Sequence, residues 1–335
     1  MLTGQLPAGR FDPPPVAADA VMRVLDNDPG KRFRDADEMA AALASPGSTH
    51  THRWKIGLGA AAIIATLCFA IWPGKGGDNA LGIRFVPLAG SEIEFSQWET
   101  RVSDYAAFVA ATGHQPTDRM FSFDTQSPRL ALVQKDDRWD APGFEQSADH
   151  PVVGVSLTDA IAFCEWFTES ERAAGRLNEG HCYRLPTERE WSLASGVNEI
   201  PADDTYGGGA NRDLADFLPW DEQAPPPPGS GNFADTSAAR ALPGLTALQH
   251  YDDGHPVTAP VADQPTNAAG IQGMLGNVWE WTAPSESRAD NDATFRGGSW
   301  TTGAFRHYLP GLRMRWSGDL RRNDIGFRIV RAPIT

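Results

Sequence analysis

Four short phrases in the second half of the chain combine tryptophan, glycine and charged residues, and they constrain the fold more than any other feature. They are YRLPTEREW at 183–191, GNVWEW at 276–281, RGGSW at 296–300 and IGFR at 325–328. The 335 residues include 11 Trp, 33 Gly and 26 Pro. This composition favours a loop-rich fold in which indole rings fill the spaces between irregular segments.

Regular helices are predicted at three places in this part of the chain. An amphipathic pattern runs over 99–111, and a second helical pattern follows Ser156, which can cap it. Thr187 can cap a third helix, with Glu190 three residues further on in the spacing of a capping box. The mixture of short helices with irregular segments predicts an α+β fold.

Residues 1–46 form a separate helical segment in which the turn Asp28-Pro29-Gly30-Lys31-Arg32 separates two helical patterns. This segment resembles the end of the C-lobe of a bacterial Ser/Thr protein kinase. The chain has no glycine-rich phosphate loop and no HRD or DFG segment, so as given it cannot phosphorylate a substrate. One alternative function is therefore the sensor domain of a receptor Ser/Thr kinase.

An almost unbroken apolar run, IGLGAAAIIATLCFAIW at 56–72, predicts a transmembrane helix over 55–73 between linkers at 47–54 and 74–81. A buried core helix is the alternative. More basic residues precede the run than follow it, which predicts a cytoplasmic N-terminus. The sequence thus predicts a single-pass inner-membrane protein whose domain at 82–335 lies in the periplasm or outside the cell.

The order of the four phrases is similar to that in the formylglycine-generating enzyme and sulfatase-modifying factor family. The resemblance covers residues 82–335 and implies an irregular, loop-rich C-type-lectin-like fold. It also bears on function, because this family contains both oxidases and catalytically silent binding proteins. The two groups differ in a few residues that can be read from the sequence.

Cysteine content separates these two groups. The resemblance implies that an oxidase holds copper with a pair of cysteines shortly after the RGGS phrase, since thiolates are soft ligands that select Cu(I). Residues 300–310 contain no cysteine, and Cys164 and Cys182 lie far upstream. We therefore expect no copper and no enzymatic activity, with a formylglycine-generating or related O2-dependent oxidoreductase as the alternative. Cys164 and Cys182 could form a disulfide or remain two thiols.

Two structural calcium sites are implied by the same resemblance, because calcium prefers carboxylate, amide and carbonyl oxygens. The first falls on Asn232, Phe233, Asp253 and His255. The second falls on Gly276, Val278 and Glu280. The family usually has Asp or Asn as a further ligand of the second site, three residues before Gly276. This chain has Gly273 at that position. Alternatively, Glu280 binds no calcium and is a buried carboxylate that accepts hydrogen bonds from loop amides.

The segment 301–324 is basic within an acidic protein of net charge −14, and aromatic residues are interleaved with its arginines. Exposed Trp, Tyr and Arg side chains dominate binding hot spots. The segment is similar to the variable region of proteins encoded by diversity-generating retroelements, in which a C-type-lectin-like domain displays diversified residues. The acidic net charge argues against nucleic acid as the partner.

The sequence therefore predicts a membrane-anchored, non-enzymatic protein that binds an unknown protein or small molecule at a variable C-terminal surface. Eleven residues are predicted to line this surface: Trp300, Thr301, Phe305, His307, Tyr308, Leu312, Met314, Arg315, Trp316, Leu320 and Arg322. Arg313, Asp319 and Arg321 are predicted to hold the scaffold beneath it.

Overall fold

The computed structural model describes residues 79–116, 119–123, 131–197, 226–284, 292–304 and 309–334. The predicted helical segment at 1–46, the predicted membrane span at 55–73 and the linker between them lie outside the described residues. So do Phe305, His307 and Tyr308 of the predicted binding surface. In the ranges that the structure describes, no helix is long and apolar enough to cross a bilayer.

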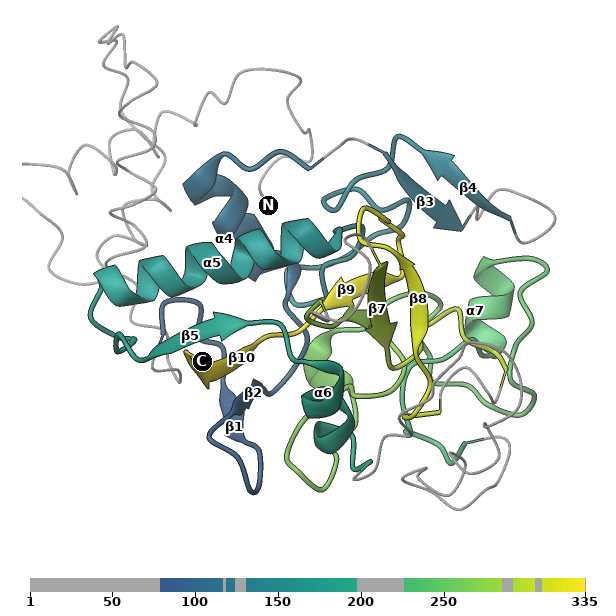
Figure 1. Cartoon of the computed structure of the whole chain (residues 1–335). Coiled ribbons are helices and arrows are strands. Elements are labelled where there is room, and N and C mark those ends of the chain that lie inside the picture. Colours follow the sequence, from purple (N-terminus) through teal and green to yellow (C-terminus); the bar gives the residue numbers. More distant parts are fainter. Residues whose placement is uncertain are drawn as a thin grey trace, which may run out of the picture. The chain divides into compact units, whose positions relative to one another are not determined.

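In the residues that the structure describes, the β structure consists of two four-stranded sheets and one hairpin (Figure 1). The first sheet has the order β1-β2-β10-β5, the second β8-β7-β6-β9, and β3 pairs with β4 alone. Within the second sheet β6 and β9 are parallel, while its other neighbours are antiparallel. The strands are β1 (Phe85–Pro87), β2 (Glu94–Ser96), β3 (Met120–Phe123), β4 (Leu132–Lys135), β5 (His181–Arg184), β6 (Trp279–Trp281), β7 (Asp292–Arg296), β8 (Met314–Ser317), β9 (Ile325–Phe327) and β10 (Val330–Pro333).

Short helices connect these strands, and the three predicted helices are confirmed. They are α4 (Val102–Thr112), α5 (Leu157–Ala173) and α6 (Glu188–Ala194), to which the structure adds α7 (Thr236–Ala241) and a 3-10 turn at Val261–Asp263. Ser156 caps α5 by accepting a hydrogen bond from the N–H of Asp159. Thr187 and Glu190 form the expected capping box of α6, so local sequence sets where both helices begin.

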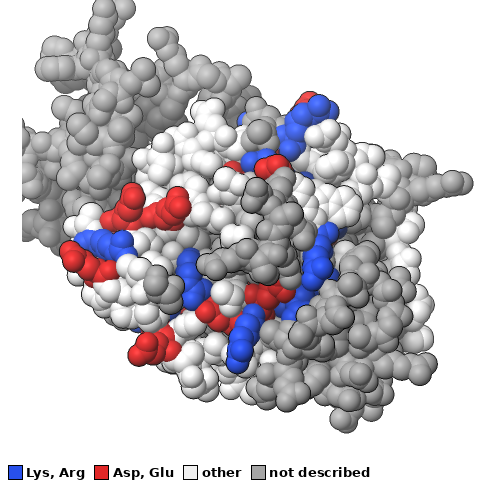
Figure 2. Space-filling view, in the orientation of Figure 1, with Lys and Arg blue, Asp and Glu red and all other residues white. Residues whose placement is uncertain are grey.

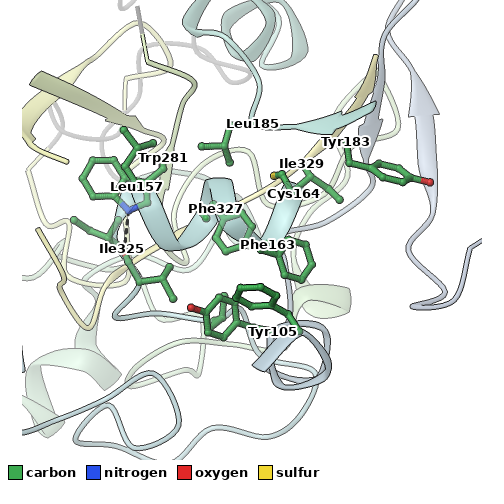
Figure 3. Packing of buried hydrophobic residues seen from close by; sticks show 14 of the residues in the cluster. Tyr105, Leu157, Phe163, Cys164, Tyr183, Leu185, Trp281, Ile325, Phe327 and Ile329 are labelled. Carbon is green, nitrogen blue, oxygen red and sulfur yellow. Dashed lines mark hydrogen bonds between the residues drawn. The ribbon is translucent and has the colours of Figure 1, made fainter. Parts of the chain in front are cut away.

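The main hydrophobic core lies where α4 and α5 pack on the ends of both sheets. Figure 3 shows Phe163 of α5 beside Tyr105 of α4 and Phe327 of β9, and all three are buried. Beyond them, the Trp281 indole donates a hydrogen bond to the carbonyl of Val155 (2.9 Å), drawn as a dashed line in Figure 3. This bond satisfies the one polar atom of a fully buried indole, as a tryptophan in a core requires.

Close backbone approach explains the glycine in the last of the four phrases. A Cβ atom built on Gly326 would lie 2.3 Å from the carbonyl oxygen of Val152. Only glycine allows β9 to pass this loop at that distance. The same segment pairs with β6, so the GNVWEW and IGFR phrases are neighbouring strands of one sheet. The mixed α+β, loop-rich fold predicted from the phrases is confirmed.

Candidate ligand-binding surface and calcium positions

The predicted binding segment contributes β8, which is an edge strand of the second sheet. Trp316 in this strand exposes 57% of its side chain, more than any other large apolar residue that the structure describes. Arg315, its neighbour, points to the opposite face of the strand, because consecutive side chains in a strand alternate. The two residues therefore do not form one continuous patch.

Two of the predicted surface residues lie in the core instead. Trp300 is fully buried and packs with Phe123 and Phe144 at ring distances of 6.0 and 5.4 Å. Leu320 exposes only 7% of its surface and joins the main core. The prediction that they line a surface is wrong, because both apolar side chains gain more from packing than from exposure. Leu312 and Met314 are half-buried against the same core.

Thr301 and Arg322 do come together, and the buried carboxylate of Asp324 joins them. The Thr301 hydroxyl donates to Asp324 Oδ2 (2.9 Å), and the Arg322 guanidinium contacts both carboxylate oxygens at 2.8 and 2.9 Å. The guanidinium also lies over the Phe123 ring at 5.6 Å. Phe123 belongs to β3, so the β3–β4 hairpin borders this part of the predicted surface.

Of the three residues predicted to hold the scaffold, two form ion pairs with helices and one is exposed. Arg313 forms an ion pair with Glu188 of α6 at 2.6 Å, and its side chain is only 7% exposed. Arg321 contacts the buried carboxylate of Asp159 at 2.8 Å. Through these two ion pairs, Arg313 and Arg321 connect the segment 301–324 to α6 and to the start of α5. Asp319 is exposed and lies in the turn directly after β8. On the face drawn in Figure 2, the described acidic and basic side chains are interspersed.

The arginine of the RGGSW phrase is a structural residue. Arg296 is fully buried, lies over the Trp191 ring at 4.7 Å, and donates to the carbonyl of Pro310 and the hydroxyl of Ser192 at 2.6 and 3.0 Å. Burial lowers the pKa of its guanidinium to about 10. The phrase therefore joins β7 to α6 and to the chain before β8.

The two described cysteines lie in other secondary-structure elements than the RGGSW phrase. Cys164 is buried in α5 and Cys182 lies in β5 of the first sheet, while the phrase at 296–300 begins at the last residue of β7 in the second sheet. Both thiols are free, which resolves the open choice between a disulfide and two thiols. Burial raises the pKa of the Cys164 thiol well above its usual range, so this group stays protonated and inert.

A buried ion pair joins the GNVWEW phrase to the IGFR phrase. The Arg328 guanidinium contacts both oxygens of Glu280 at 2.7 Å, and the Trp191 indole donates to Glu280 Oε2 at 2.7 Å. The same guanidinium donates to the carbonyls of Gln272 and Gly273 at 2.9 and 3.0 Å. A cation, the guanidinium, is thus already bound to these oxygens.

Glu99 completes this cluster from the other side. Its carboxylate is fully buried, accepts a hydrogen bond from the Asn277 amide (3.0 Å), and has one oxygen without a partner. Burial, together with the nearby Glu280 and against the attraction of Arg328, raises the pKa of Glu99 to about 7. A Cβ atom on Gly273 would lie 2.9 Å from this carboxylate.

The expected second calcium site therefore does not fit the residues present. Its only carboxylate, Glu280, is engaged by Arg328 and Trp191. The position of the further ligand is Gly273, and Glu99 fills the space that a larger side chain there would need. Gly276 and Val278 remain as backbone carbonyls beside this cluster. The alternative interpretation of Glu280 as a buried, satisfied carboxylate describes this geometry.

The residues of the expected first calcium site fit better. Asn232 is buried, and its side-chain oxygen has no partner, although its amide donates to Val257 O and Asn277 Oδ1. Burial raises the pKa of Asp253 to about 7, although its carboxylate accepts the N–H groups of Phe233 and His255. An unpaired oxygen and a destabilised carboxylate are what a calcium ion would satisfy. In the described part of the chain no group of three or more His, Cys, Asp or Glu side chains could hold a metal, so backbone carbonyls would have to contribute.

Comparison with known proteins establishes the family. The sulfatase-modifying factor enzyme 1-like domain matches residues 90–333, which is most of the chain. The chain belongs to this family. Its sulfatase-modifying factor domain is 30% identical over 215 residues to the formylglycine-generating enzyme of Mycobacterium tuberculosis, covering 56% of this chain and 59% of that protein.

Catalytically inactive relatives match equally well. The domain is 31% identical over 192 residues to the inactive C-alpha-formylglycine-generating enzyme 2 of Bos taurus, covering 56% of this chain and 52% of that protein. The chain thus spans less than two thirds of the length of these relatives. Among solved structures, PvdO from Pseudomonas aeruginosa matches with a TM-score of 0.44 and 22% identity over 72% of this chain and 80% of its own. Treponema denticola variable protein 1 matches with a TM-score of 0.40 and 19% identity over 72% and 84%.

Two structural features of the site were not predicted from the sequence. The first is the β3–β4 hairpin, whose only sequence signal was a long stretch without clear periodicity. The second is the role of Glu99, for which the sequence predicts only the start of a helix. Its position just before a capped helix gave no sign that it faces Glu280, which is far away in sequence.

Proposed function

We propose that the sulfatase-modifying factor domain of this protein is a non-catalytic module that binds a ligand at its C-terminal surface. The observation that carries the proposal is the cysteine content. The chain has three cysteines, and none follows Cys182, so no thiol pair is available after the RGGSW phrase. Copper in the oxidases depends on such a pair, and the segment that follows the RGGSW phrase contains no thiolate in its place.

The exposed residues of the C-terminal segment support a binding role. Trp316 presents a large indole to solvent, and Thr301 and Arg322 are held in place by Asp324. A rigidly supported arginine beside aromatic rings is a common feature of binding hot spots. The described surface is therefore smaller than the predicted one: Thr301, Trp316 and Arg322 remain, whereas Arg315 lies on the opposite face of β8. Leu312 and Met314 are half-buried against the core.

The finer parts of the proposal concern diversification and anchoring. We infer that residues 300–324 form a diversified segment of a retroelement target and that residues 55–73 anchor the protein in the inner membrane. The mixture of residue types at 301–322 supports the first, and the apolar run supports the second. A near-copy of the 3′ coding end beside a reverse transcriptase gene, differing at adenines, is the result expected for a diversified gene.

A copper titration tests the proposal of a non-catalytic domain. The full chain is titrated with Cu(I) in competition with a chromophoric chelator, with the M. tuberculosis relative as a positive control. We expect the chelator to retain the copper in the presence of this chain. A tightly held, redox-active copper ion at one equivalent would contradict the proposal and favour the oxidoreductase alternative.

A further inference from the structure

The β3–β4 hairpin carries a cluster of exposed large apolar side chains. Five large apolar side chains are exposed in the described residues, and Phe121, Leu132 and Val133 of this hairpin are three of them, at 37–40%. The hairpin borders the proposed ligand-binding surface, because the Arg322 guanidinium lies over Phe123. Its register pairs Phe121 with Gln134 and Phe123 with Leu132.

Backbone hydrogen bonds show which way each strand residue points. The N–H of Phe121 donates to Arg321 O (2.8 Å), and Phe121 O accepts from the N–H of Asn323 (3.1 Å). The N–H of Phe123 donates to the Asn323 side chain at 3.2 Å. Phe121 and Phe123 therefore direct their backbone groups away from β4, toward residues 321–323.

It follows that Phe121–Gln134 and Phe123–Leu132 are the non-hydrogen-bonded pairs of this antiparallel ladder. In such a pair the partner residue also points its N–H and C=O outward. The backbone groups of Leu132 and Gln134 thus face the outer edge of β4, where no described residue bonds them. The N–H and C=O groups of this edge can therefore pair with those of another extended chain.

We propose that the outer edge of β4 binds an extended peptide segment of a partner protein by strand addition. The complementarity is one of partial charge, because N–H and C=O groups alternate along the edge and only an extended backbone carries the matching alternation. The exposed side chain of Leu132 lies on the face of the hairpin that carries Phe121 and would contact alternate residues of the peptide. This partner class rests on the proposed ligand-binding function and extends its surface onto the hairpin.

Proline at the edge provides a selective test. The N–H of Gln134 faces outward, so Gln134→Pro removes a donor that the hairpin itself does not use, at a place where sheets tolerate proline. The matched control Gln134→Thr keeps the N–H and changes only the side chain. A random peptide library displayed on phage is panned against the full chain, and the selected peptides are measured by fluorescence anisotropy.

We expect the selected peptides to bind the wild type and Gln134→Thr alike and to bind Gln134→Pro about tenfold more weakly or worse. N-methylation along the peptide gives a second measurement on the wild-type protein, independent of how the variant folds. Methyl groups at every second residue should abolish binding, and those at the intervening residues should not. If N-methylation weakens binding equally at every position of the peptide, strand addition is wrong.

The remaining outcomes separate this proposal from the function on which it rests. If Trp316→Ala abolishes peptide binding while Gln134→Pro does not, the binding function stands and strand addition is wrong. If no peptide is selected, or if neither variant changes peptide binding, strand addition at β4 is wrong, while binding of a small molecule at the C-terminal surface stays open to its own test. If the wild type is a dimer that Gln134→Pro converts to a monomer, the occupant is a second copy of the chain, which also overturns the assignment.

Discussion

Arg328 and Glu280 form a two-point ion pair with N–O distances of 2.7 Å, and their side chains expose no more than 1% of their surface. They join neighbouring strands of the second sheet, since Arg328 directly follows β9 and Glu280 lies in β6. The Trp191 indole adds α6 to the same carboxylate. One buried contact thus holds together three of the four phrases that are typical of the family.

Removing one partner of this pair should strongly destabilise the domain. We expect Arg328→Met to lower the free energy of unfolding by about 3–5 kcal/mol, because the Glu280 carboxylate would remain buried without its cation. The control is Arg138→Met, since the Arg138–Asp140 pair is half exposed and should contribute less than about 1 kcal/mol. Urea unfolding of both variants makes the comparison, and similar losses would contradict this interpretation.

The calcium content of the protein should be one ion per chain. We propose that calcium binds at the first site, whose residues fit it, and not at the second, where Arg328 already contacts Glu280. Isothermal titration of the metal-free full chain should give a single site that Asp253→Asn abolishes. Glu99→Gln, which alters the second cluster, should leave this stoichiometry unchanged. Two ions per chain would show that the guanidinium does not take the place of calcium.

Glu99 should make the domain less stable as the pH rises. Its pKa is raised from 4.5 to about 7, so the folded state binds a proton more tightly than the unfolded state. Its stabilising contribution is therefore complete below pH 4.5 and is lost progressively between about pH 4.5 and 7.

The isosteric variant Glu99→Gln tests this sign, because it keeps the shape of the neutral carboxyl group. We expect it to unfold like the wild type near pH 4.5 and to be more stable at pH 8 by about 1–3 kcal/mol, since one pKa unit corresponds to about 1.4 kcal/mol. Denaturant unfolding at several pH values measures the difference. A variant that is less stable than the wild type at pH 8 would mean that the ionised carboxylate contributes to folding.

The two tryptophans of the C-terminal segment should behave oppositely. Trp300→Ala should cost about 3–5 kcal/mol of stability, because the indole is fully buried among Phe123 and Phe144. Trp316→Ala should change stability by about 0.5 kcal/mol or less, because its side chain is 57% exposed. Thermal unfolding of both variants distinguishes them. A large loss for Trp316→Ala would assign this residue to the core rather than to a binding surface.

Local signals predicted the helices and the fold class well. Ser156 and Thr187 cap the helices that their sequence context predicts, because a cap depends on residues only three positions away. The positions of Trp300 and Leu320 were predicted wrongly for the opposite reason. Burial of an aromatic or aliphatic side chain depends on partners such as Phe123 and Phe144, which lie far away in sequence.

The charged cluster around Glu280 could not be predicted either, because it also depends on residues that lie far apart in the sequence. The sequence left open whether this carboxylate binds calcium or satisfies other groups, and Gly273 already suggested a departure from the family pattern. The deciding residues, Glu99 and Arg328, lie 181 and 48 positions away from Glu280 and carry no local signal of their contact with it. Only the fold brings them together.

We propose that this member of the family does not oxidise cysteine. The most direct measurement incubates the copper-treated full chain with oxygen, a reductant and a sulfatase-motif peptide, beside the M. tuberculosis enzyme, and follows the peptide by mass spectrometry. We expect the peptide cysteine to remain unchanged with this chain and to be converted by the control. Conversion of that cysteine to formylglycine by this chain would contradict the account.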